Sequence, residues 1–131
     1  MSTPMLLMYN LENEKGSKIK LLCLKLRIKI RIVKSEEYLQ PLGAVAGLGA
    51  PENDSVYQGE GFGDEMLVMV NFTNDVLNSF LQEMRGQQLK PVSLKAVLTP
   101  TNASWDSIAL HEEIKKEHEV MTAKMAARSG Q

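Results

Sequence analysis

The sequence predicts a mixed α/β (α+β) fold, with a four-stranded sheet made from two βαβ repeats. The segment MLLMYNLENE at residues 5–14 returns as MLVMVNFTND at 66–75. Each copy begins with a short apolar run, which is typical of a strand buried on both faces. Apolar residues at helical spacing follow, and then a stretch in which apolar and polar residues alternate, as in a strand with one wet face.

The first repeat covers about residues 4–34. Its helix carries one apolar stripe, and its second strand alternates isoleucine with cations, which suits the edge of a sheet. These residues are Ile19, Leu22, Cys23 and Leu26 for the stripe, and Ile28, Ile30 and Ile32 for the strand.

A link over residues 35–64 joins the repeats. It contains a weak helix around 38–48, because Pro41, Gly43 and Gly47 disfavour helix there. A loop rich in glycine and acidic residues follows, and we interpret it as a linker or lid. Gly59–Gly63 precedes a strand rather than following one, so it does not fit a dinucleotide loop.

The second repeat covers about residues 65–99, and a C-terminal helix covers about 104–125. Thr73 is a good N-cap for the second repeat's helix. The strand that follows alternates Val92, Leu94, Ala96 and Leu98 with polar residues. The last helix has an apolar stripe through Leu110, Ile114, His118, Met121 and Met125.

Two sheet orders fit this sequence of elements. We prefer a ferredoxin-like sheet, with the first strand of each repeat at the centre, and the alternative is a small doubly wound parallel sheet. Residues 1–131 are expected to form a single domain. The outer face of the sheet would be apolar at its centre, so the last helix or a second subunit must cover it.

Charge and cysteine content restrict the class of protein. Every charged residue from 18 to 34 is basic and every one from 35 to 84 is acidic, although the net charge is only −1. We expect the two segments to face each other or a second copy, and the alternative is an anion-binding face. A pI near 6.1 argues against a nucleic-acid-binding protein, and no apolar run is long enough for a membrane span.

A single cysteine and the lack of a signal-peptide pattern predict a cytoplasmic protein.

The candidate ligand site is the junction where the last strand gives way to the last helix. Free backbone N–H groups at such a junction attract anions, and Lys95 would add charge. The alternative is purely structural, with a turn at Pro100 and a helix cap at Asn102 or Ser104. The candidate ligand-binding residues here are Lys95, Thr99, Thr101 and Asn102.

Asn10 and Asn71 end equivalent strands. In a parallel sheet both would lie beside the Thr99–Asn102 turn, whereas in a ferredoxin-like sheet they would lie at opposite ends and act only as local caps. His111 and His118 are two helical turns apart, too far for one metal ion. No catalytic residues, metal site or cofactor are predicted.

The stretch LKAVLTPTNASW, with EMLVMVNFTNDVLNSFLQEMR before it and LHEEIKKEHE after it, resembles a family of small, uncharacterised bacterial proteins known only as a domain of unknown function. The resemblance covers residues 65–119. It implies no activity, substrate or cofactor. The residues that it marks are Lys95, Thr99, Pro100, Thr101, Asn102, Trp105, Glu117 and His118.

From these observations we expect a cytoplasmic binding or regulatory protein without catalysis, which associates as a homodimer. The alternative is an anion- or nucleotide-binding protein with its site at the Thr99–Asn102 turn. The basic segment at 18–34 lacks interleaved aromatic residues, so RNA binding by stacking is not expected.

Overall fold

The structure is a computed structural model that describes residues 3–48, 53, 55–59, 61–89, 92 and 94–129, with side chains as far as residue 124. Parts of the predicted link and the residues just before the last strand lie outside the described residues. The strands are β1 (Met5–Tyr9), β2 (Lys29–Ile32), β3 (Met66–Val70) and β4 (Leu94–Val97). The helices are α1 (Glu14–Lys25), η1, a 3-10 turn (Ser35–Glu37), α2 (Leu42–Val45), α3 (Asn74–Gly86) and α4 (Ser107–Ser129).

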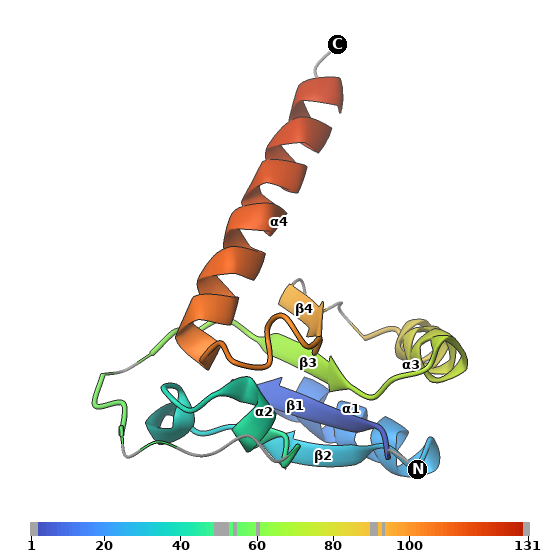
Figure 1. The fold of residues 1–131 in the computed structure, drawn as a ribbon. Coiled ribbons are helices and arrows are strands. Elements are labelled where there is room, and N and C mark those ends of the chain that lie inside the picture. The colour runs from blue at the N-terminus through green and yellow to red at the C-terminus, as the bar shows by residue number, and fades with distance from the viewer. Residues whose placement is uncertain are drawn as a thin grey trace.

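The four strands form one mixed sheet in the order β2-β1-β3-β4 (Figure 1). β1 is parallel to β2 and β3 is parallel to β4, whereas the central pair β1 and β3 is antiparallel. The α+β class, the two βαβ units and the central position of the two buried strands are confirmed. The ferredoxin-like order is not found, and the sheet is not wholly parallel. Each unit pairs its own two strands, and the units meet through β1 and β3.

The two βαβ units have matching backbone features 61 residues apart. Asn10 and Asn71 both take left-handed backbone angles, with φ of 59° and 58°, and so do Arg27 and Gln88, with φ of 60° and 55°. Leu7 lies opposite Val68 in the antiparallel pair, so a local twofold axis passes between β1 and β3. The units therefore share their local conformation. Their origin by duplication stays a prediction.

One face of the sheet packs against α1 and α3. Alternate side chains of the two central strands enter this layer and meet the predicted helical stripes. The buried residues include Leu6, Met8, Leu67 and Met69 from the strands, and Ile19, Leu22, Cys23, Phe80 and Met84 from the helices. Lys25 of α1 pairs with Glu83 of α3 at 2.8 Å. Together with the Arg31–Glu37 pair, this contact brings the basic and acidic segments together within one chain.

The other face of the sheet is covered by the link and by the first turns of α4. Tyr38, Leu42 and Val45 from the link pack on this face together with Leu110 of α4. Of the weak helix predicted around residues 38–48, only the four residues of α2 are α-helical, and the 3-10 turn η1 lies just before that range. The link and α4 of the same chain thus bury the apolar outer face of the sheet, so a second subunit is not needed to bury it.

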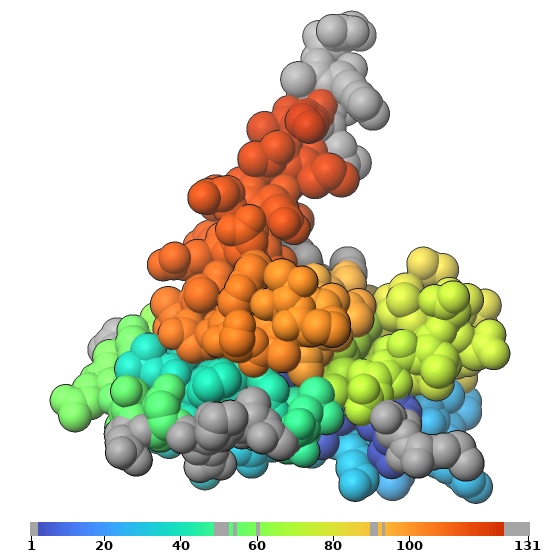
Figure 2. Space-filling view, in the orientation of Figure 1, coloured from blue at the N-terminus to red at the C-terminus, as the bar shows by residue number. Residues whose placement is uncertain are grey.

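Helix α4 begins at the sheet and then leaves it. Leu110 is buried, but every residue from 115 to 124 is exposed. In Figures 1 and 2 this part of α4 projects away from the two βαβ units. In the part of the chain that the structure describes, no helix combines the length and the apolar character that crossing a bilayer requires.

Candidate functional site

The Thr99–Asn102 turn follows β4 and is held by its own polar groups. The Asn102 side-chain oxygen accepts from the Thr99 N–H at 2.8 Å, and its Nδ2 donates to the Val97 carbonyl at 3.1 Å. The Thr99 hydroxyl oxygen accepts from the Asn102 N–H at 3.2 Å. Asn102 is buried and Thr101 is exposed. These bonds give Asn102 a structural role, and anion binding at the turn stays a prediction.

The segment after this turn positions both α2 and α4. The Trp105 carbonyl accepts from the Leu42 N–H at 2.8 Å, which fixes the start of α2. The Asp106 carboxylate accepts from the Ala109 N–H at 2.8 Å and caps α4. The last helix therefore starts at Ser107 with Asp106 as its cap, instead of following the predicted caps Asn102 or Ser104. The reason is that residues 100–105 form turns.

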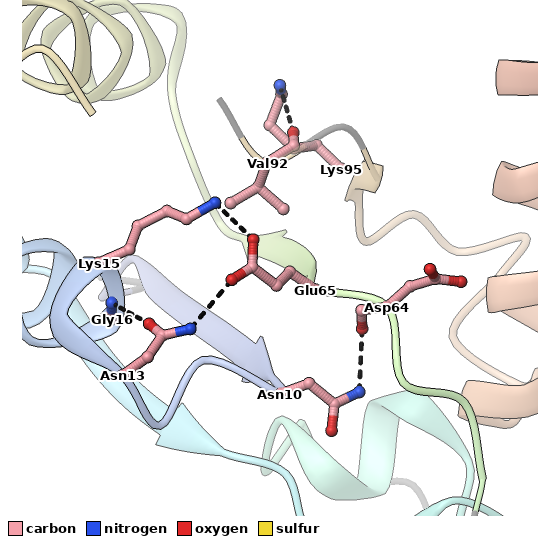
Figure 3. A network of polar contacts seen from close by, with 8 residues as sticks. All are labelled: Asn10, Asn13, Lys15, Gly16, Asp64, Glu65, Val92 and Lys95. Carbon is pink, nitrogen blue, oxygen red and sulfur yellow. Dashed lines mark hydrogen bonds and ion pairs between the residues drawn. The ribbon is translucent and has the colours of Figure 1, made fainter. Parts of the chain in front are cut away.

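Asn10 and Asn71 lie at opposite ends of the sheet because β1 and β3 are antiparallel. Each occupies a left-handed position after its strand, a conformation that asparagine tolerates better than most residues. Asn10 also donates from Nδ2 to the carbonyls of Phe62 and Asp64, at 2.8 and 2.9 Å. The contact with Asp64 is drawn in Figure 3. Asn10 thus ties the end of the link to β1.

Lys95 lies near the start of β4, away from the turn that ends this strand. Its ammonium donates to the Val92 carbonyl at 2.8 Å, and partial burial lowers the pKa of the amine below its ordinary value. The six candidate residues therefore do not converge. Asn71, Thr99, Thr101 and Asn102 belong to one end of the sheet, and Asn10 and Lys95 to the other.

A polar hollow of about 480 Å³ borders Asn10 at the carboxyl ends of the parallel strands β1 and β2. Such an edge is where open α/β sheets usually bind ligands. The lining contains one cation, Lys34, but also the acids Glu12 and Glu36. This mixture of charges does not favour an anion, so the hollow does not extend the predicted anion site.

An aromatic cluster joins the link to α4. The rings of Phe62 and His111 stack with centroids 3.8 Å apart, and Phe62 also stacks on Tyr38 at 4.8 Å. The buried Tyr9 hydroxyl lies 2.8 Å from the Ser107 hydroxyl, and burial raises the pKa of Tyr9. No motif or spacing in the sequence predicted this cluster. One available signal was that two of the three tyrosines and Phe62 fall within the 35–64 link, which indicates a packed segment.

Two consecutive acids at the end of the link bind two different helices. Asp64 contacts His111 Nε2 at 2.8 Å, and this hydrogen bond lowers the pKa of the Asp64 carboxyl. Burial raises the pKa of Glu65, but hydrogen bonds from Lys15 and Asn13 of the first unit outweigh it, so the net pKa is lowered (Figure 3). Among the described residues, no three His, Cys, Asp or Glu side chains gather as a metal ion would require.

The fold and these contacts define an α+β protein of two βαβ units with a projecting C-terminal helix. Residues 65–121 match the model of a family described as "Domain of unknown function (DUF3783)". The match runs from the start of β3 into the exposed part of α4, and supports the predicted resemblance to an uncharacterised family. No curated protein and no solved structure matches the chain.

Proposed function

We propose that this is a binding or regulatory protein without catalysis, which acts as a homodimer formed through α4. The observation that carries this proposal is the exposed part of α4, which presents two large apolar side chains to solvent. Val120 is 49% exposed and Met121 is 60% exposed. A helical segment that buries no face is only marginally stable in water, so a partner for this segment would stabilise it.

The side chains of α4 suit a second copy in antiparallel orientation. Glu117, Val120, Met121 and Lys124 follow the i, i+3, i+4, i+7 spacing and so lie on one stripe. An antiparallel pair centred between Val120 and Met121 sets Glu117 of each copy opposite Lys124 of the other. This pairing buries the apolar centre and flanks it with two opposite-charge pairs.

The overall charge of α4 supports the same orientation. Residues 112–119 contain four glutamates and two lysines, whereas residues 120–129 contain Lys124 and Arg128 and no acid. In an antiparallel pair the acidic half of each helix meets the basic half of the other. The two βαβ bodies then lie at opposite ends of the helix pair, so they do not collide. Such an interface has twofold symmetry and is closed, as in most soluble dimers.

Sedimentation equilibrium or light scattering of the purified chain tests this proposal. We expect a dimer, and we expect the Val120→Glu/Met121→Glu variant to be a monomer with an unchanged circular dichroism spectrum. Thr122→Glu adds a charge on the opposite side of the same helix and should leave the dimer intact. A monomeric wild-type chain at its highest soluble concentration would overturn the proposal.

Charge reversal tests the antiparallel orientation. Glu117→Lys or Lys124→Glu alone should weaken the dimer, since each places like charges opposite each other, and the double variant should restore it. In a parallel pair each residue would meet its own copy, so the single reversals would have no such effect. Equal dimer affinity in all four proteins would therefore contradict the antiparallel arrangement.

The cytoplasm is part of this proposal. Cys23 is buried in the α1 and α3 layer, and burial raises the pKa of its thiol to about 12. A buried thiol of this kind reacts poorly with oxidants, and a chain with one cysteine can form no intramolecular disulfide, which suits a reducing compartment.

A further inference from the structure

A hollow of about 260 Å³ lies between the C-terminal half of α3 and the start of β4. Its lining is mostly apolar, and it comes from the helix, from the segment after it and from the strand. The apolar residues are Phe80, Leu81, Met84, Leu89 and Val92, and the polar ones are Arg85 and Lys95. The two polar residues are both cations.

Lys95 is a half-buried cation without a counter-ion among the described residues. Its only hydrogen bond there is the one to the Val92 carbonyl, and none of the described ion pairs includes it. Removing an ammonium from water costs free energy unless a negative charge compensates. The lowered pKa of Lys95 has the same cause, since burial disfavours its charged form. An anion beside Lys95 would relieve this cost.

Arg85 adds a second positive charge at the same hollow. It lies in the last turn of α3 and is exposed, and no described acid pairs with it. A guanidinium can hold a carboxylate through two parallel hydrogen bonds. The hollow therefore combines an apolar wall with two cations, the arrangement that a ligand with an apolar body and an anionic end requires.

We propose that this hollow binds a small carboxylic acid, with the hydrocarbon part against Phe80, Met84 and Leu89 and the carboxylate at Lys95. An apolar cavity of about 150 Å³ holds benzene, so the volume here accommodates a chain or ring of roughly six to eight carbons. A nucleotide is too large for this volume and too polar for a lining that is mostly apolar, so it is not the expected ligand. The site is separate from the Thr99–Asn102 turn and does not depend on dimerisation through α4.

The two cations of the hollow are a feature of the second βαβ unit, and the first unit lacks both. The strand registers make Ile30 the counterpart of Lys95, and the offset of 61 residues makes Leu24 the counterpart of Arg85. Both cations are thus replaced by apolar residues. In addition, α1 and β2 are separated by residues 26–28, whereas α3 and β4 are separated by residues 87–93. The longer connection and the two cations belong to the second unit alone.

Titration of the full chain with octanoate, followed by NMR of the methionine and leucine methyl groups, tests this inference. We expect octanoate to shift the methyl signals of Met84 and Leu89, while acetate, which lacks the chain, and octanol, which lacks the charge, bind at least roughly tenfold more weakly. Equal binding of octanoate and octanol, or no binding of octanoate, would overturn the proposal.

Variants identify the residue that holds the carboxylate. Lys95→Met keeps the length of the side chain without its charge and should weaken octanoate binding roughly tenfold or more. Lys29→Met removes an exposed lysine from the other edge strand and should leave the affinity unchanged. Arg85→Gln changes an exposed residue that folding tolerates, and it should weaken binding several-fold even if Lys95→Met does not fold. Wild-type affinity in both hollow variants would rule out the site.

Discussion

The two βαβ units have the same backbone plan but present different surfaces. Helices α1 and α3 end with equivalent hydrogen bonds. The Ile28 N–H donates to the Cys23 carbonyl after α1, and the Leu89 N–H donates to the Met84 carbonyl after α3, at positions 61 residues further along. On the outer surface of α1, however, Leu21 and Leu24 are 67% and 74% exposed. At the same offset α3 carries Gln82 and Arg85. The shared part is thus the buried scaffold, and the differences lie where the units meet solvent or other segments.

The entry to each unit shows a second difference. Asp64 and Glu65 precede β3 and bind α4 and α1, respectively. At the same offset Thr3 and Pro4 precede β1 and carry no charge. The acids that attach the second unit to its neighbours therefore have no counterpart in the first. Substitutions at paired positions can test how far the equivalence of the units extends.

The largest effect is expected at Gly16, whose counterpart in the second unit is Leu77. A Cβ atom at Gly16 would lie 1.6 Å from the Leu11 carbonyl oxygen, which is backbone and cannot simply move aside. We therefore expect Gly16→Ala to lower the free energy of unfolding by at least about 2 kcal/mol. Urea unfolding followed by circular dichroism measures this change.

Gly86→Ala is the matched control in α3, because a Cβ atom there meets nothing within 4 Å. Alanine favours helix over glycine, so this variant should be neutral or more stable by a few tenths of a kcal/mol. If Gly16→Ala were equally harmless, the Leu11 carbonyl could not lie as close to Gly16 as the structure places it. The first unit would then tolerate a side chain where the second has one.

The buried scaffold could be predicted from the sequence because burial depends on residue type. The apolar runs at 5–9 and 66–70 became the two central strands, and Thr73 caps α3 as its position suggested, with its hydroxyl accepting from the Val76 N–H. The order of the strands could not be predicted. The strand that follows each helix can lie beside either central strand and place the same side chains on the buried faces, so the apolar pattern does not distinguish the two orders.

The candidate site was harder to predict, because tertiary contacts decide which polar groups remain available. Asn102 could be recognised as part of a turn, but its three hydrogen bonds with Val97 and Thr99 follow from the folded loop. Phe62 and His111 stack because the link folds back against α4. Residue spacing within either segment does not predict this contact, because the two residues are far apart in the sequence. The hollow beside Lys95 is a matter of packing, which residue spacing does not show.

A moderate effect is expected at the paired left-handed positions Asn10 and Asn71. Glycine adopts this conformation without steric cost, so Asn71→Gly should change the free energy of unfolding by no more than about 0.5 kcal/mol. Asn10→Gly also removes the hydrogen bonds to the Phe62 and Asp64 carbonyls, and should cost roughly 1 kcal/mol. Urea unfolding of both variants gives the difference. Equal values would mean that the link gains no stability from Asn10.

The smallest effect is expected at Asp64, which the first unit replaces with Thr3. The hydrogen bond from His111, with Lys115 Nζ 3.4 Å away, lowers the pKa of Asp64 in the folded state relative to the unfolded state. A lowered pKa means that folding favours the charged carboxylate. The stabilisation is therefore complete above the ordinary aspartate pKa near 4, and it is lost as the pH falls through the folded-state pKa.

The wild-type chain and Asp64→Asn, unfolded with urea at a series of pH values, provide the measurement. The Asp64 side chain is 45% exposed, so solvent limits its contribution to about 1 kcal/mol or less. We expect the wild type to be the more stable protein at pH 5–6 and its advantage to shrink as the pH is lowered toward 2. An advantage that stays constant over this range would show that the carboxylate charge does not hold the link to α4.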